Sequence, residues 1–205
     1  NLASRLVDGT VRAYQQALTL HMMPINLIGV AISNAAFPQL TEHLGEGRND
    51  LFQKDLRSLL RIIFWMALPV SVVIFFTRGY VVHFIRNGGN QLIAGILGCL
   101  VVAILFRTIY HMAARAFYAR QDTKTPLYIS IFSITLNIIL AIVLSMVLKM
   151  GAYGLAWAQS TVAVLEVVVL LAVMNHQMPK LFDMTFVRAI FKMMIAGTIT
   201  GVVCY

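Results

Sequence analysis

The sequence predicts an all-α protein, a polytopic bundle of membrane-spanning helices. Of its 205 residues, 60% are hydrophobic and only 12% have charged side chains, and the mean hydropathy is +0.81. Apolar runs of about 18 or more residues follow one another along the chain, and runs of that length cross a bilayer as helices. This pattern is not that of a soluble domain.

Six such runs define the predicted spans. They cover residues 10–38, 59–77, 92–118, 127–148, 152–174 and 186–205, in one membrane domain of residues 1–205. Polar side chains interrupt the first run, so we expect that helix to avoid lipid. Pro69 predicts a kink in the second, because proline lacks a backbone donor. The segment 149–153 is so short that its flanking helices must form an antiparallel hairpin.

The distribution of Lys and Arg predicts which loops face the cytoplasm, because cytoplasmic loops hold the excess. One side has ten of these residues: Arg48, Lys54, Arg57, Arg61, Arg115, Arg120, Lys124, Lys180, Arg188 and Lys192. The other side has five: Arg5, Arg12, Arg78, Arg86 and Lys149. We therefore expect the first side to be cytoplasmic. There, Phe52 and Leu56 in the segment 41–58 predict an amphipathic helix lying on the membrane surface.

The segment "RAFYARQDTKTP", residues 115–126, joins the third and fourth runs. Arg115 and Arg120 are expected to anchor a helix end at the lipid headgroups, and Pro126 suits the first turn of the next helix. An ordinary connecting loop would serve the same purpose.

Several function classes find no support in the sequence. The net charge of +8 does not predict nucleic-acid binding, because the basic residues lie between apolar runs. Cys99 and Cys204 are far apart within apolar runs, so neither a disulfide nor a metal site is expected. The sequence shows no nucleophile with a matching base, no metal-binding cluster and no phosphate-binding glycine loop, so neither an enzyme nor a cofactor is predicted. A start at Asn1 and an apolar end at Tyr205 predict a piece of a longer protein.

Three motifs resemble the MurJ/MviN family of lipid II flippases, within the larger group of multidrug and oligosaccharidyl-lipid exporters. They are "PINLIGVAISNAAFPQLTEHLGEG" at 24–47, "FYARQDTKTP" at 117–126 and "GLAWAQSTVAVL" at 154–165. The resemblance implies about six helices, the eighth to the thirteenth, of a two-lobed transporter of about fourteen, whose N-terminal lobe is missing here. It also implies multi-pass location in the bacterial plasma membrane, in contact with its lipids.

The function that this resemblance implies is transport of lipid II, a lipid-linked disaccharide-peptide, from the cytoplasmic to the outer leaflet by alternating access. The alternatives are an exporter of another lipid-linked glycan, a drug or cation antiporter of the same fold, a membrane scaffold, or a transferase whose active site lies elsewhere. The family's Asp-Arg pair before the proline that matches Pro24 is absent, because Leu18 and Thr19 stand there. Agreement with the family loop implies a cytoplasmic hinge that includes Arg120, Asp122, Lys124 and Pro126.

The candidate substrate ligands on the third run are Arg107 and His111, which with Arg115 follow an i, i+4, i+8 pattern over about 12 Å of helix. A charge near mid-membrane costs roughly 2.5–3.5 kcal/mol, and such residues usually face a bundle interior or a wet cavity. Arg107, helped by His111, is expected to bind the substrate diphosphate, since guanidinium matches phosphate geometry. The alternative is an Arg107 neutralised by an acidic neighbour and a His111 satisfied in the core.

Glu166 is the acidic residue near the middle of the fifth run. It is expected either to pair with Arg107 or to bind the proton or cation whose gradient drives transport.

The first run places polar and small residues on roughly one stripe: Gln15, Thr19, Asn26, Gly29 and Ser33. Of these, Gln15, Thr19 and Asn26 are further candidates for substrate binding, and close helix packing would explain the same stripe equally well. Asn137 in the fourth run is expected to hydrogen-bond to another helix.

Overall fold

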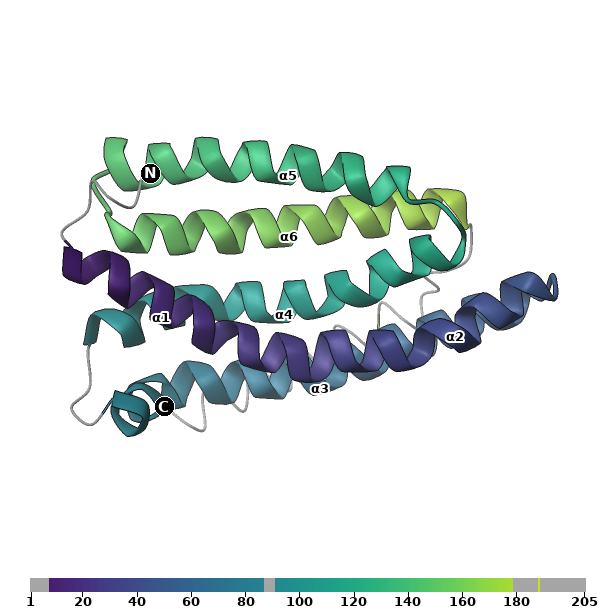
Figure 1. The fold of residues 1–205 in the computed structure, drawn as a ribbon, viewed down its shortest axis with the longest axis horizontal. Coiled ribbons are helices and arrows are strands. Elements are labelled where there is room, and N and C mark those ends of the chain that lie inside the picture. The colour runs from purple at the N-terminus through teal and green to yellow at the C-terminus, as the bar shows by residue number, and fades with distance from the viewer. Residues whose placement is uncertain (1–7, 87–90, 179–187, 189–205) are drawn as a thin grey trace.

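The computed structural model describes residues 8–86, 91–178 and 188 (Figure 1). Its elements are α1 (Asp8–Pro24), π-helix η2 (Ile25–Val30), α2 (Ala31–Gly45), α3 (Asn49–Arg86), α4 (Gln91–Ala119), α5 (Lys124–Ile142), π-helix η3 (Val143–Val147) and α6 (Ala152–Gln177). Within these residues there is no strand, and five helical spans have the length and hydropathy to cross a membrane. The predicted all-α membrane fold is confirmed. The predicted span 186–205 lies outside the described residues, apart from Arg188.

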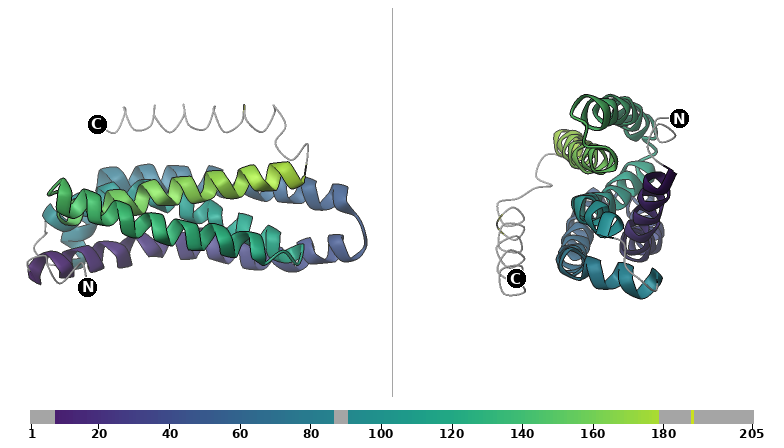
Figure 2. Two further views of the ribbon diagram at one scale, coloured as in Figure 1. Left: turned by 90° about the horizontal axis from the view of Figure 1, so that it is seen from above. Right: turned by 90° about the vertical axis from the view of Figure 1, so that its left-hand side faces the viewer.

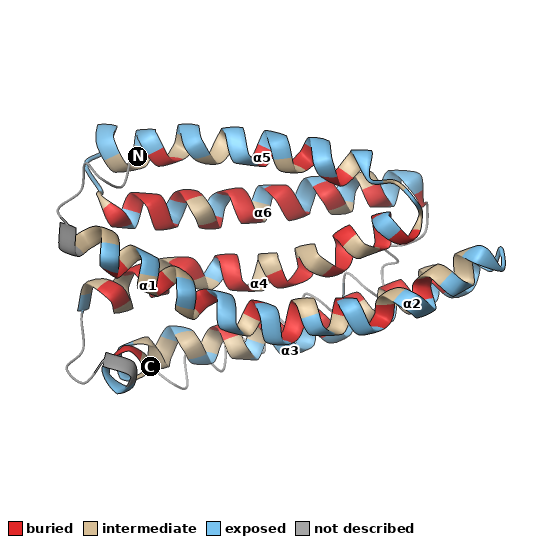
Figure 3. Ribbon diagram, viewed as in Figure 1, coloured by how far each residue is buried: buried red, intermediate tan, exposed pale blue. Residues whose placement is uncertain are grey.

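Helix α4 is the centre of the bundle. It packs against α1, η2, α2, α3 and α6, and it has buried side chains along its whole length (Figures 2 and 3). Helix α5 packs along α6 and barely contacts α4. As a result, α6 has one buried face, while α5 is exposed on most of its surface (Figure 3).

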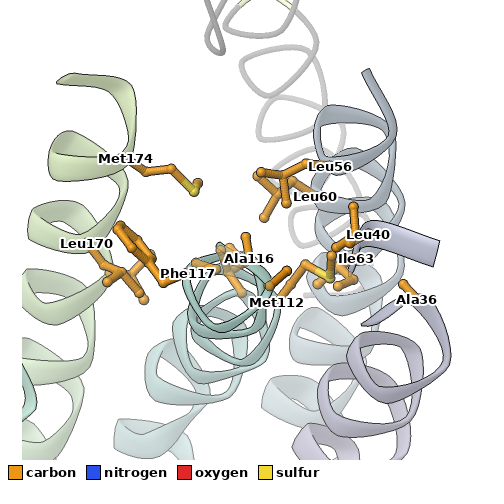
Figure 4. Packing of buried hydrophobic residues seen from close by; sticks show 14 of the residues in the cluster. Ala36, Leu40, Leu56, Leu60, Ile63, Met112, Ala116, Phe117, Leu170 and Met174 are labelled. Atoms are coloured by element: carbon orange, nitrogen blue, oxygen red, sulfur yellow. The ribbon is translucent and has the colours of Figure 1, made fainter. Parts of the chain in front are cut away.

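Two apolar clusters hold α4 in place. The larger lies at the end where α2 meets α3 and includes Leu40, Leu56, Ile63, Met112, Phe117 and Leu170 (Figure 4). The second includes Ala13, Ala17, Val82, Ile96 and Ala156. Lipid tails are as apolar as these side chains, so the part within the bilayer is held mainly by close packing rather than by exclusion of water.

The prediction of a separate surface helix over residues 41–58 is wrong, because this segment is divided between the end of α2 and the start of α3. Helix α2 continues to Gly45, and α3 then runs unbroken from Asn49 to Arg86 through Pro69. Phe52 and Leu56 are 1% and 0% exposed in the larger cluster. An i, i+4 apolar pair fits a membrane surface and a protein core equally well. At this end of the bundle the two side chains pack in the protein core rather than against lipid, because burial away from water stabilises each such side chain by roughly 1.5–3 kcal/mol.

A π-helix interrupts the first span directly after Pro24. Proline has no N–H to continue the α-helical hydrogen bonding, and the wider turns of η2 follow it. Within η2, Gly29 lies against α4, where an added Cβ would be 3.0 Å from both Cα and the carbonyl oxygen of Thr108. Glycine therefore permits this close approach of two backbones.

The turns after α2 and after α4 have the same Schellman geometry. Gly47 and Gln121 occupy equivalent positions, with φ of +73° and +61°. The pairs of backbone bonds are Arg48 N to His43 O (2.8 Å) with Gly47 N to Leu44 O (3.1 Å), and Asp122 N to Phe117 O with Gln121 N to Tyr118 O (both 3.0 Å). Both turns lie at the end of the bundle that is predicted to be cytoplasmic (Figure 1).

The antiparallel hairpin of α5 and α6 is confirmed (Figure 1). Its turn contains Lys149 and Gly151, with φ of +53° and +57°. Gly154, in the first turn of α6, packs on η3, where an added Cβ would lie 2.6 Å from the carbonyl carbon of Leu144. The hairpin can close this tightly because that position has no side chain.

The Schellman turn at Gly47 gives a prediction with a matched control. Gly47→Ala should lower the free energy of unfolding by about 1 kcal/mol, because an L-residue is strained at positive φ. Gly45→Ala should be neutral or stabilising, since Gly45 is helical and no atom lies within 4 Å of the added Cβ. Unfolding of the purified protein in detergent measures both. Equal effects at the two positions would contradict the turn.

Candidate functional site

A polar chamber lies between α4, α5 and α6 at the middle of the bundle. Its volume is about 280 Å³. Its lining residues are Arg107 and Tyr110 of α4, Ser130, Ser133, Ile134, Asn137 and Ile138 of α5, and Gln159, Val162 and Glu166 of α6. Polar side chains predominate in a bundle that is otherwise apolar, which is unusual at membrane depth.

An ion pair joins α4 to α6 inside this chamber. Arg107 Nη1 lies 2.9 Å from Glu166 Oε2, and the two side chains are 28% and 3% exposed. Both residues are near the middle of their helices, so each charge offsets part of the other's cost of lying in the membrane. Glu166 Oε2 accepts no aligned hydrogen bond among the described residues. The contact is thus a close ion pair, and the exposed part of Arg107 remains open to the chamber.

A short hydrogen-bonded chain connects Glu166 to the other two helices. The Ser130 hydroxyl donates to Glu166 Oε1 at 3.3 Å and lies 2.8 Å from the Tyr110 hydroxyl. Because the Ser130 proton points to the carboxylate, Tyr110 must donate to Ser130. The Arg107 guanidinium also lies 5.9 Å from the centre of the Tyr110 ring. Glu166 thus holds groups from both neighbouring helices.

Two amide side chains form the next layer, farther from the predicted cytoplasmic end. Asn137 Nδ2 donates to Gln159 Oε1 at 3.1 Å, which shows the interhelical bond that was expected of Asn137. The other amide atoms, Asn137 Oδ1 and Gln159 Nε2, have no hydrogen-bond partner among the described residues. One acceptor and one donor are therefore free for a ligand.

The basic stripe on α4 divides between two neighbours. Arg107 points to Glu166, whereas Arg115 Nη2 donates to Asn34 Oδ1 of α2 at 2.6 Å and lies 5.4 Å from the centre of the Phe37 ring. Eight residues on an α-helix produce a rotation of roughly 80°, which is enough to separate them. His111 is partly buried between them and does not line the chamber. Arg115 is thus tied to α2 by an exposed hydrogen bond near the end of α4.

The polar stripe of the first span is also divided. Gln15, Thr19 and Asn26 are exposed, whereas Gly29 and Ser33 are buried against neighbouring helices. The change occurs within the π-helix η2, which contains both Asn26 and Gly29 and whose longer turns shift the face that a 3.6-residue period predicts. None of the three exposed residues lines the chamber.

Sequence reasoning missed Tyr110, Ser130, Ser133 and Gln159. A signal was available for two of them, since Ser130, Ser133 and Asn137 recur at i, i+3 and i+7 in an apolar run. Among the described residues, no three His, Cys, Asp or Glu side chains converge as metal ligands do.

Comparison with known proteins places this chain in a family. A sequence model described as "Lipid II flippase MurJ" matches residues 1–205. The chain belongs to the MurJ family. This confirms the resemblance found in the motifs at 24–47, 117–126 and 154–165.

The MurJ relatives are longer than this chain. "Probable lipid II flippase MurJ" of Borreliella burgdorferi is 28% identical over 165 residues, which are 78% of this chain and 32% of that protein. The protein of the same description from Thermotoga maritima is 26% identical over 209 residues, 99% of this chain and 41% of that protein. The chain thus spans less than half the length of these relatives.

A solved structure shares the MurJ fold with this chain. It is titled "Lipid II flippase MurJ, inward closed conformation" and superimposes with a TM-score of 0.81 at 23% identity. The match covers 100% of this chain and 43% of that structure.

The MurJ-like loop between α4 and α5 is fixed by side-chain contacts. Arg120 Nη1 donates to Gln177 Oε1 at the end of α6 at 2.6 Å. Asp122, one residue before the N-cap position Thr123, accepts from the Thr125 N–H at 3.1 Å and from the Thr125 hydroxyl at 2.7 Å, so its carboxylate caps a first-turn N–H of α5. These bonds hold the pKa of the Asp122 carboxyl below its ordinary value. Pro126 lies in the first turn of α5, where its missing N–H costs nothing, and Lys124 begins the helix.

The Asp122 cap predicts a pH-dependent contribution to stability. Asp122→Ala should lower the free energy of unfolding by about 1 kcal/mol at neutral pH. The folded pKa is the lower one, so this contribution is complete above the unfolded value of about 3.9 and disappears as the pH falls through the folded value. Thermal unfolding in detergent, followed from pH 7 down to a pH below the folded pKa, measures it.

The control for this prediction is Asp50→Ala. Asp50 lies in the first turn of α3, and no capping hydrogen bond to it is found among the described residues. The control should have a smaller effect. A wild-type advantage over D122A that stays unchanged at acid pH would contradict the cap.

Proposed function

We propose that this chain is part of a transporter that moves lipid II, the lipid-linked peptidoglycan precursor, from the cytoplasmic to the outer leaflet of a bacterial plasma membrane. The named activity of the relatives supports the substrate. The observation that carries the proposal is an open polar chamber with an ion pair at half depth in an apolar bundle. A non-catalytic role fits this arrangement, because translocation needs a polar path and no covalent step.

The substrate diphosphate would meet the basic face of α4. Arg107 and His111 remain the proposed contacts. Arg107 lies near the middle of α4, and Arg115, held by Asn34, lies nearer the predicted cytoplasmic end. A guanidinium can bind two oxygens at once, so Arg107 can keep one contact with Glu166 and offer others to a phosphate. A phosphate that moves along α4 would thus remain close to positive charge.

Leu18 and Thr19 strengthen the case for α4 as the site of headgroup contact. Leu18 packs against the second apolar cluster, and the Thr19 hydroxyl donates to the Gln15 carbonyl at 3.0 Å. Neither residue supplies the charge that the family's Asp-Arg pair supplies. The exposed side chains of Gln15, Thr19 and Asn26 can still offer neutral contacts from the first span, outside the chamber.

Alternating access gives roles to Glu166 and to the loop after α4. Glu166 is proposed as the counter-ion that holds Arg107 when no substrate is bound; ion coupling through its carboxylate is the second role to test. The loop of Arg120, Asp122, Lys124 and Pro126 is proposed as the cytoplasmic hinge, since it ties the start of α5 to the end of α6. An exporter of another lipid-linked glycan, or a drug or cation antiporter, is the alternative function.

Rescue of a bacterial strain depleted of its lipid II flippase tests the substrate. The full natural polypeptide that contains this chain should restore growth and cell shape when expressed in the membrane. Absence of rescue at normal membrane levels would favour an exporter of a different substrate.

Variants of the ion pair test the role of Arg107. Arg107→Gln should destabilise the protein by about 3–5 kcal/mol, because Glu166 would be buried without a cation. The double variant R107Q/E166Q should recover most of that loss. If Arg107 binds the diphosphate, the double variant should be folded and yet inactive when flipping of a fluorescent lipid-linked precursor is measured in vesicles.

Undiminished flipping by R107Q/E166Q would assign Arg107 to structure alone. The same vesicles, under an imposed ion gradient, test Glu166. A Glu166→Gln variant that responds to the gradient as the wild type does would eliminate ion coupling through this carboxylate.

A further inference from the structure

The chamber has two chemically different ends. The end nearer the predicted cytoplasmic side, here called the inner end, holds the Arg107–Glu166 pair, with Tyr110 and Ser130 hydrogen-bonded to it. Its outer end has no charged lining residue and consists of Ser133, Asn137 and Gln159 between apolar side chains of α5 and α6. The two ends therefore suit different parts of one ligand.

The charge balance of the chamber argues against the binding of an anionic group at the outer end, beyond the Arg107–Glu166 pair. Arg107 and Glu166 carry opposite charges 2.9 Å apart, so their fields largely cancel a few ångströms away. A single unbalanced charge would attract a phosphate at this distance, whereas a balanced pair attracts it far less. Beyond the pair, the chamber offers little net attraction to a phosphate.

The polar atoms at the outer end are both donors and acceptors. Asn137 Oδ1 can accept and Gln159 Nε2 can donate, while Asn137 Nδ2 and Gln159 Oε1 fix each other's orientation at 3.1 Å. The Ser133 hydroxyl can do both. A metal ion would need several oxygen ligands and no N–H donors. Adjacent hydroxyl or amide groups of a neutral ligand match this set, because each presents a donor beside an acceptor.

The size and the apolar walls narrow the ligand further. The whole chamber, including its Arg107 end, has a volume of about 280 Å³, or roughly nine waters at about 30 Å³ each, so its uncharged end has room for one six-membered sugar ring and not for two. Ile134, Ile138 and Val162 line the same space and can cover the C–H face of such a ring. Pockets that combine apolar walls with a few oriented polar groups are typical of small-ligand sites.

We propose that the chamber binds one neutral sugar ring of the lipid-linked substrate, with the attached diphosphate at the Arg107 end. This inference rests on the proposed function and assigns a part of the substrate to a part of the protein. Asn137, Gln159 and Ser133 bind the ring's hydroxyl or acetamido groups. Transport then selects for the glycan, because a ligand without it leaves these buried polar groups unpaired.

The experiment uses cysteine protection in the full natural polypeptide. In a background with Cys99→Ala and Cys204→Ala, Ser133→Cys reports on the chamber and Thr135→Cys is the control, since Thr135 is exposed on the same helix outside the chamber. The probes are a polyprenyl diphosphate and the same lipid bearing a neutral N-acetylated disaccharide. The readout is the rate of labelling by a small methanethiosulfonate reagent in detergent.

The disaccharide-bearing lipid should slow labelling of S133C at least tenfold, and the bare diphosphate should leave it within about twofold, with T135C unchanged by either. Adding Asn137→Leu and Gln159→Leu should abolish protection, whereas Thr135→Val, tested in the S133C protein, should not. Equal protection by both lipids, or protection by neither, overturns the sugar site.

Failure of this inference is distinguishable from failure of the proposed function. Rescue of the flippase-depleted strain does not depend on where the sugar lies. Rescue together with an unprotected S133C would reject the chamber assignment and keep lipid II transport. Protection of S133C without rescue would reject lipid II as the substrate and keep a glycan site.

Discussion

The need to hold opposite charges together at half depth in the membrane governs this bundle. Arg107 can lie in α4 because Glu166 of α6 is 2.9 Å away, and Glu166 can be almost fully buried because Arg107 and Ser130 face it. These contacts fix the rotation of α4 and α6 relative to each other and bring α5 alongside. The polar chamber follows from that requirement, since its remaining walls must not seal the exposed part of the guanidinium away from water.

The number and order of the described helices were predictable because hydrocarbon thickness sets the length of an apolar run. Their ends were not. Helix α3 extends well beyond 59–77 in both directions, since backbone hydrogen bonds and core contacts continue outside the apolar region. The first turn of α3 looked like a surface helix because sequence spacing shows that Phe52 and Leu56 share a face but does not show what covers that face.

The candidate site was predictable in its charged members only. Arg107 and Glu166 stand out because ionised residues in apolar runs are rare. Ser133 and Gln159 do not, because neutral polar residues in membrane helices usually serve helix packing. The stripes on α4 and on the first span were divided for geometric reasons. In an α-helix of 3.6 residues per turn, side chains at i and i+8 point in directions roughly 80° apart. In the first span, the π-helix after Pro24 has longer turns, so side chains beyond it no longer follow the 3.6-residue period.

The weak contact between α5 and α4 has a further consequence. One wall of the chamber is attached to the protein through α6 and through the loops at its two ends, and almost nowhere through α4. A change in the tilt of α5 would alter the width of the chamber's mouth and leave the α4–α6 ion pair and the second apolar cluster in place, whereas Ile129 links α5 to the larger cluster. The width of the mouth therefore depends on a helix that has few contacts with α4, at the centre of the bundle.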